Sequence, residues 1–135
     1  MGNVWYRSAM DALPRKGLDW TTDSIKAYPV GPAYVVDRDA HIFVAALGAN
    51  VLGAPVLIAN REVLADGVLD GDDLSFADLA AGAIVAAIVI AVDSGTPETS
   101  RLQLYFDTGL NLPFIADGDP LSVQWDNGPN RIAKV

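Results

Sequence analysis

The chain of 135 residues carries 17 acidic and nine basic residues, a formal net charge of -8, and contains no cysteine. Its length suits one domain that can bury a core without a metal or disulfide, and a hydrophobic share of 51% excludes a disordered chain. The missing thiols exclude cysteine catalysis, Cys-based zinc sites and disulfides, and the negative charge disfavours nucleic acid and anionic membranes as partners.

We predict two parts, an N-terminal arm over residues 1–17 and a β domain over residues 18–135. Residues 3–13 can form a short helix that begins at Asn3 and ends before Pro14. Because no long apolar stretch follows basic residues near the start, the sequence predicts no signal peptide and a protein made and kept in the cytoplasm.

The arm is rich in apolar and aromatic side chains for a terminal segment. One interpretation is that it packs on its own domain. The other is that it docks on a neighbouring subunit, because an exposed aromatic arm is an association site. In the second case the predicted partner-binding residues are Val4, Trp5, Tyr6 and Met10.

The first half of the β domain is predicted to alternate strands with turns. A strand over residues 25–29 ends at Pro29 or lies at an edge, since proline cannot donate to a ladder. A short internal helix is expected over residues 40–47, begun by Asp39 and ended by Gly48. Strands are also expected over residues 54–60, 62–69 and 74–76, with turns at 60–61 or 66–67 and at 70–73.

Residues 79–92, LAAGAIVAAIVIAV, form an uninterrupted apolar stretch. It is too short for a membrane-spanning helix, and its β-branched residues favour a buried strand, although residues 84, 88 and 91 also share one helical face. Alternation would direct the larger side chains to the main core and the smaller ones to a close cover from another segment or subunit. The larger set is Ile84, Ala86, Ile88, Ile90 and Val92, and the smaller set is Val85, Ala87, Val89 and Ala91.

Residues 101–106, RLQLYF, predict a half-exposed strand with Leu102, Leu104 and Phe106 inward and the other three outward. A long loop is expected over residues 107–120, because this segment is rich in Gly, Pro and Asp.

Residues 121–125 and 131–135 flank the sequence DNGPN, which is typical of a hairpin turn. Several short strands with little helix predict the fold class. It is a mostly β, single-domain antiparallel β-sandwich or barrel, with a short N-terminal helical arm and one short internal helix.

Acids are the abundant titratable residues. The cluster Asp66, Asp70, Asp72, Asp73 and Asp78 has the oxygen chemistry of a calcium site but not the spacing of a helix-loop-helix calcium loop, so solvated turn acids are the default interpretation. The one histidine, His41, has no Ser- or Cys-based nucleophile motif to activate, and no phosphate-binding glycine pattern occurs. We therefore predict no catalytic residue, no cofactor, no metal and no enzymatic activity.

Four segments, Leu18–Ala27, Val68–Phe76, Ala87–Gly95 and Gln124–Val135, read LDWTTDSIKA, VLDGDDLSF, AIVIAVDSG and QWDNGPNRIAKV. Together they resemble a group of short virion structural proteins of tailed bacteriophages. In that group a segment like I-D-W-x-x-D-T-I-K opens the domain, an apolar strand ending in D-T-G lies near the middle, and Q-W-D-N-G closes it. The sequence departs from the group at Pro29 and Ala91.

The resemblance implies a virion component and supplies no catalytic residue. We expect a non-enzymatic capsid decoration (cement) protein that binds the major capsid protein or other virion proteins, is homo-oligomeric on the particle and is assembled in the host cytoplasm. The alternatives are a tail, neck or fibre-associated module, and a carbohydrate- or host-receptor-binding module that uses Tyr105, Trp125 and the acidic loop. An acid-based hydrolase is a third hypothesis.

Overall fold

The computed structural model describes residues 4–7, 20, 23–64, 68–76, 79, 81–107, 112–117, 120–123, 125 and 132–134. These residues form an antiparallel β-sandwich with one short 3-10 helix, so the predicted mostly β fold class is confirmed. The elements are β1 (Val4–Trp5), β2 (Ile25–Val30), η2 (Val44–Asn50), β3 (Val56–Leu57), β4 (Glu62–Leu64), β5 (Val68–Asp70), β6 (Leu74–Phe76), β7 (Ile84–Val85), β8 (Ala87–Val92), β9 (Arg101–Phe106), β10 (Phe114–Ile115), β11 (Leu121–Val123) and β12 (Ala133–Lys134). No helix in these ranges is long and apolar enough to cross a membrane.

The central sheet has the strand order β1-β9-β8-β2-β3 and is built around β8. Strand β8 pairs along its length with β2, from Val92 opposite Ile25 to Ala87 opposite Val30, and with β9 on its other side. The β-branched composition of this stretch suits such a doubly paired position. The predicted buried strand is therefore confirmed for Ala87–Val92, whereas Ile84–Val85 forms the separate short strand β7 and Gly82 lies in a turn with a φ of 89°.

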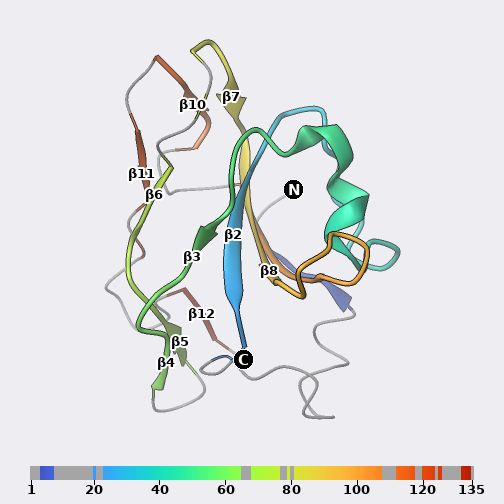
Figure 1. Ribbon diagram of the computed structural model, residues 1–135, viewed down its shortest axis with the longest axis vertical. Helices are drawn as coiled ribbons and strands as arrows, with labels where there is room; N and C mark the ends of the chain where they lie inside the picture. Colours follow the sequence, from blue (N-terminus) through green and yellow to red (C-terminus); the bar gives the residue numbers. More distant parts are fainter. Residues whose placement is uncertain are drawn as a thin grey trace.

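A second layer of short strand pairs covers one face of this sheet. It consists of β12-β5-β4, β11-β6 and β10-β7. In Figure 1 these strands lie to the left of β2 and β8, except for β7, which lies above them, while η2 lies on the right. In the β6–β11 pair, Leu74 and Phe76 are buried and Ser75 between them is exposed, as the predicted alternation requires.

The two faces of β8 line two separate cores. Ile88 and Ile90 pack between the layers in the main core with residues such as Phe76. The smaller Ala87, Val89 and Ala91 contribute to a second core, where the cover comes from the chain's own segment 34–47. The predicted division into a large and a small face is thus confirmed for residues 87–92, and the close cover is intramolecular.

The alternation predicted for residues 84–92 is wrong before Ala87. Val85 is fully buried in the main core, and Ile84, expected to be inward, is 41% exposed. Ala86 lies between β7 and β8 and belongs to neither strand. This extra residue shifts the alternation by one position. The side chains before it therefore point to the face opposite to the predicted one.

The strand predicted over residues 101–106 is confirmed, with Leu102, Leu104 and Phe106 buried and Arg101 exposed, but the outward positions predicted for Gln103 and Tyr105 are wrong. All residues from Leu102 to Phe106 are buried. The pairing with β8 shifts between Ile90, opposite Leu104, and Ala91, opposite Leu102, which leaves Gln103 as a bulge. Leu102 is consequently turned to the second core, and the side chain of Gln103 is 1% exposed.

Strand β2 neither ends at Pro29 nor lies at an edge. The carbonyl oxygen of Pro29 accepts a hydrogen bond from Leu52 N at 2.9 Å, while the next carbonyl, that of Val30, accepts one from Ala86 N at 2.9 Å. Proline therefore occupies a position whose main-chain groups face away from β8. The N–H that proline lacks is not needed for the β2–β8 ladder.

The internal helix lies later than predicted over residues 40–47. It begins at Val44, without a side-chain cap at Phe43, and Gly48 lies inside it with a φ of 55°. Asp39, which was expected to begin it, lies in a turn instead, because Asp37 Oδ1 accepts hydrogen bonds from Asp39 N and Ala40 N at 3.1 and 3.0 Å.

The helical arm predicted over residues 3–13 is wrong at its start, because Val4–Trp5 forms the edge strand β1, with Val4 opposite Tyr105 and Trp5 opposite Leu104. The ladder of β9 offers main-chain partners that outweigh a short isolated helix. Residues 8–19 lie outside the described part of the chain.

The predicted C-terminal hairpin is wrong as well. β11 pairs with β6 and β12 pairs with β5, so these two strands take partners from earlier in the chain. The expected loop over residues 107–120 contains β10, which pairs with β7. The turn residues 126–130 lie outside the described ranges.

Candidate functional site

The predicted partner-binding residues lie at the edge of the central sheet as far as they are described. Trp5 packs against the main core as a partly buried residue. Tyr6 is fully buried, and its main-chain N donates to Gln103 O at 2.9 Å. The Tyr6 ring therefore packs in the core of its own domain. Partner binding by Val4 and Trp5 stays a prediction, and Met10 lies outside the described residues.

Tyr6 belongs to a buried hydroxyl cluster in the second core. Its hydroxyl lies 2.7 Å from the hydroxyl of Tyr34, which in turn lies 2.8 Å from His41 Nδ1. The hydroxyl of Tyr105 donates to Asp107 Oδ2 at 3.3 Å. His41 thus has a structural environment: it holds Tyr34 and accepts a weak bond from Asp37 N at 3.3 Å.

Burial governs the acid–base properties of this cluster. It raises the pKa of Tyr6 far above its ordinary value, and the hydrogen bond between Tyr6 and Tyr34 adds to the effect. Burial and the nearby Asp107 carboxylate raise the pKa of Tyr105 to about 12. Burial also raises the pKa of Tyr34. The folded protein therefore strongly favours the neutral phenols.

We expect the protein to lose stability in alkali because of these tyrosines. An unfolded tyrosine ionises near pH 10, whereas the folded cluster holds its protons to higher pH, so the unfolded state binds fewer protons in this range. The tyrosines thus leave the free energy of unfolding unchanged below about pH 10 and lower it as the pH rises toward about 12. Urea unfolding followed at a series of pH values measures this slope.

The matched variant for this prediction is Tyr6→Phe, which keeps the ring and removes one buried hydroxyl. Its unfolding free energy should decline less steeply above pH 10 than that of the wild-type chain. Equal slopes for the two proteins would show that Tyr6 does not contribute to alkaline unfolding.

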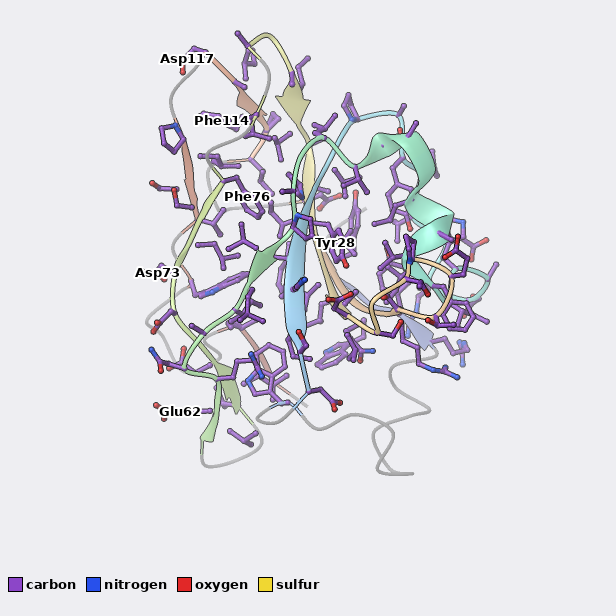
Figure 2. All side chains as sticks on the ribbon, in the orientation of Figure 1. Tyr28, Glu62, Asp73, Phe76, Phe114 and Asp117 are labelled. Carbon is purple, nitrogen blue, oxygen red and sulfur yellow. The ribbon has the colours of Figure 1, made fainter. Side chains whose placement is uncertain are left out.

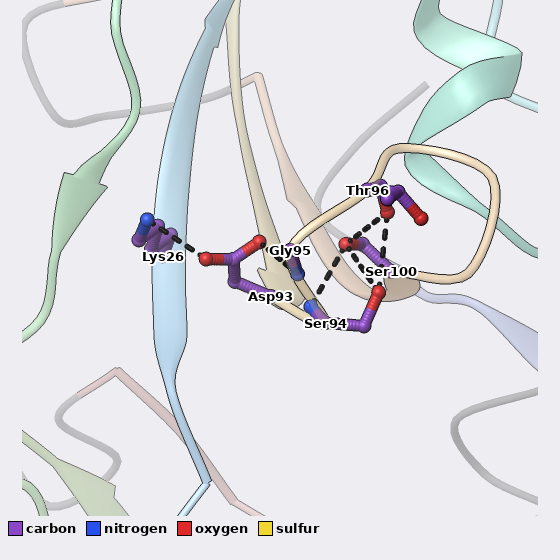
Figure 3. A network of polar contacts seen from close by, with 6 residues as sticks. All are labelled: Lys26, Asp93, Ser94, Gly95, Thr96 and Ser100. Atoms are coloured by element: carbon purple, nitrogen blue, oxygen red, sulfur yellow. Dashed lines mark hydrogen bonds and ion pairs between the residues drawn. The ribbon is translucent and has the colours of Figure 1, made fainter.

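A second polar network closes the loop after β8 (Figure 3). Lys26 Nζ forms an ion pair with Asp93 Oδ2 at 2.8 Å, and Asp93 Oδ1 accepts a bond from Gly95 N at 3.0 Å. These contacts lower the pKa of Asp93, with Lys26 as the largest cause. Ser94 N donates to Ser100 Oγ at 3.0 Å, and Ser100 Oγ donates to Thr96 O at 2.7 Å. These side chains bond to groups within the loop or on β2, and the bonds fix the conformation of the loop.

A third polar arrangement surrounds the acidic turn at residues 70–73. Trp20 Nε1 donates to Asp70 O at 3.0 Å, and Trp125 Nε1 donates to Asp72 O at 2.9 Å. The main-chain N of Trp125 donates to Asp73 Oδ1 at 3.0 Å. Both indoles are 5% exposed. The turn is therefore held from two sides by tryptophans that lie about 50 residues away in the sequence.

The same turn has a close contact that requires glycine. A Cβ on Gly71 would lie 2.6 Å from Ile58 Cγ2, which is closer than side chains tolerate. Asp72 N donates to Ala59 O at 2.9 Å, and Asn60 Nδ2 donates to Asp72 Oδ2 at 2.7 Å. Asn60 itself has a φ of 52°, as a turn residue accepts.

Arg61 ties the segment before β2 to the turn after β3. Its Nε donates to Trp20 O at 2.6 Å, its Nη1 to Ile58 O at 2.5 Å, and its Nη2 to Asp23 O. A guanidinium can make several such bonds at fixed angles, and a charged donor strengthens each of them.

The acidic cluster has structural contacts where it is described. Asp70, Asp72 and Asp73 shape the turn, and Asp66 and Asp78 lie outside the described ranges. Within those ranges no group of three or more His, Asp or Glu side chains is placed to hold a metal ion.

The residues named for sugar stacking are buried. Tyr105 is 7% and Trp125 is 5% exposed, and the Trp125 ring packs at a centroid distance of 5.7 Å from Phe106. A sugar-binding platform needs an accessible ring face. These two residues are therefore core residues in this structure.

An exposed apolar pair lies on the ribbon formed by β7 and β10. Ile84 and Ile115 are cross-strand partners and are 41% and 67% exposed, while Val85 opposite Phe114 faces the core. The sequence pattern placed Ile84 inside and did not identify the pair. The sequence feature that could have indicated this surface is the unequal distribution of charge. Residues 62–130 hold 12 acidic residues and one basic residue, Arg101.

No model of a known protein family matches the chain, and no curated protein matches it either.

Proposed function

We propose that the chain is a non-enzymatic structural protein of a tailed-bacteriophage particle, and specifically a decoration protein that binds the major capsid protein on the head. The observation that carries the proposal is where the motif residues lie. Trp20, Trp125 and the 70–73 turn come from three of the four resembling segments, and the two indole N–H groups meet that turn.

Further motif residues support the same proposal. Ile25 and Ala27 pair with Val92 and Ile90 at the middle of the sheet. The residues that carry the resemblance are therefore those that determine the fold, which supports a shared fold with the virion proteins. Function is then assigned by analogy of fold and motif, with no transfer of an active site.

The polar groups of the domain are consistent with a structural role. The serine and threonine hydroxyls after β8 bond one another and main-chain carbonyls, and His41 bonds a buried tyrosine. A decoration protein needs a rigid body and a modest contact repeated over many copies on the lattice. A small β-sandwich with an acidic surface provides such a body.

Quantitative mass spectrometry of purified particles of the encoding phage tests the proposal. The expected result is a copy number comparable with that of the major capsid protein. A few copies per particle would replace the head assignment by a tail, neck or fibre role. Absence of the chain from washed particles would overturn the proposal as a whole.

A further inference from the structure

The β7–β10 ribbon presents the one directly opposed pair among the exposed large apolar side chains of the described residues. Those side chains are Val35, Ile42, Leu57, Val63, Ile84 and Ile115. Leu57 lies opposite Lys26 and Val63 opposite Leu69, whereas Ile84 and Ile115 lie opposite each other. Adjacent side chains on one face make a continuous apolar surface, which single exposed residues do not.

The ribbon is firmly positioned by the core beneath it. Val85 is fully buried, and Phe114 packs against the main core on the same side. Gly82 N donates to Ala116 O at 2.6 Å and Ala116 N donates to Ala83 O at 2.8 Å, which extends the pairing on one side of the isoleucines, while Val85 and Phe114 pair on the other. Ile84 and Ile115 are therefore held outward by a fixed backbone.

The sequence on either side of this pair is acidic. The segments 77–92 and 107–125, which include the ribbon, contain Asp78, Asp107, Asp117 and Asp119 and no Lys, Arg or His. Figure 2 shows Asp117, Asp73 and Glu62 spread along the outer layer of the sandwich, on the side opposite to η2. All three are exposed.

The charge is unequal over the whole molecule. Residues 62–130, which supply most of the outer layer, have a formal charge of -11, and the rest of the chain has a formal charge of +3. The one basic residue of the acidic part, Arg101, lies over the Phe43 ring at 5.5 Å, next to η2. The outer layer therefore carries an excess of negative charge, with the basic residue Lys134 on its strand β12.

We propose that the outward face of the β7–β10 ribbon, centred on Ile84 and Ile115, docks on a partner protein that presents an apolar site bordered by Lys and Arg side chains. An apolar centre with a complementary charged rim is the usual anatomy of a specific interface. Pairing of this face with the same face of a second copy does not fit, because it would bring together two surfaces of the same negative charge. The inference deepens the proposed function and rests on it, since the partner would be a protein of the particle.

The test uses particles of a phage whose gene for this chain is deleted, to which purified chain is added back. The double variant Ile84→Ser/Ile115→Ser should bind at least about tenfold more weakly than wild type, because it removes the apolar centre. Asp117→Lys should also weaken binding, and wild-type binding should weaken at high ionic strength.

Two matched variants on the other side of the sheet serve as controls. Val35→Ser removes a side chain that is 79% exposed between Tyr34 and Val36 of the second core, and Glu98→Lys makes the same charge change in the exposed loop after β8. Both should bind as wild type does. Thermal melting should confirm that all variants are folded.

Each outcome is decisive. If wild type binds and the ribbon variants bind equally well, the ribbon is not the docking face, and the proposed function stands. If wild type does not bind and is absent from particles, the proposed function fails together with this inference. Self-association of the free chain that the double variant abolishes, seen by analytical ultracentrifugation, would assign the face to a second copy and overturn the basic partner.

Discussion

Ile88→Asp is expected to leave the protein unfolded. Ile88 is fully buried on β8, the strand around which the central sheet is built, and it lies opposite Pro29 on one side and Phe106 on the other. A carboxylate there would have no partner in the apolar core and would cost several kcal/mol. Since a domain of this size is stable by roughly 5 to 15 kcal/mol, the native state would be lost. Far-UV circular dichroism and thermal melting measure this.

Ile84→Asp is the matched control for that prediction. It makes the same substitution four residues earlier in the same apolar stretch, at a side chain that is 41% exposed. The carboxylate can remain in water, so the variant should fold with a melting temperature close to that of wild type. A folded Ile88→Asp protein, or an Ile84→Asp protein that unfolds, would contradict the change of face at Ala86.

Trp125→Ala should lower the free energy of unfolding by about 3 to 5 kcal/mol. The indole ring is buried against Phe106, and its N–H satisfies Asp72 O at the acidic turn. Truncation therefore removes both a large apolar volume and a long-range hydrogen bond. Urea unfolding at neutral pH gives the difference directly.

Trp125→Phe separates these two contributions. It keeps an aromatic ring in the core and removes the N–H, so the expected loss is smaller, about 1 to 3 kcal/mol. Trp125→Ala could instead have the same free energy of unfolding as wild type and lose binding to a glycan. The ring would then be a binding platform, and this result would support the carbohydrate-binding hypothesis.

The elements that could be predicted from the sequence are those with a clear local pattern of composition and alternation. The β-branched residues of 87–92 identify a strand without knowledge of any partner, and the contrast between Ile88 and Ala87 identifies its two faces. Leu74 and Phe76 alternate with an exposed serine in the same way. These features depend on composition and period two alone, which a single sequence contains.

The errors have a common physical origin, because a bulge or break changes the phase of the pattern without a residue that marks it. Ala86 interrupts a run of small and β-branched residues and resembles its neighbours, yet it reverses Ile84 and Val85. At Gln103 a polar residue inside an alternating strand is an ordinary outward position, and only the pairing with β8 makes it a bulge.

The contacts that determine the candidate sites are long-range. The bond from Trp20 to Asp70 and the bond from Trp125 to Asp72 join segments that no local pattern relates. The Ile84–Ile115 pair likewise depends on the antiparallel pairing of β7 with β10. The charge asymmetry of residues 62–130 was visible in the sequence, but its place on one layer follows from the topology.

The three main-chain bonds of Arg61 give this cysteine-free chain a cross-link that does not depend on oxidation. Two of them join residues that are 38 and 41 positions apart, a span over which secreted domains often use a disulfide. A guanidinium keeps its charge and its donors in reducing and oxidising surroundings alike. The hydrogen bonds of Arg61 therefore do not depend on the redox conditions. They remain when the domain is moved from a reducing to an oxidising compartment.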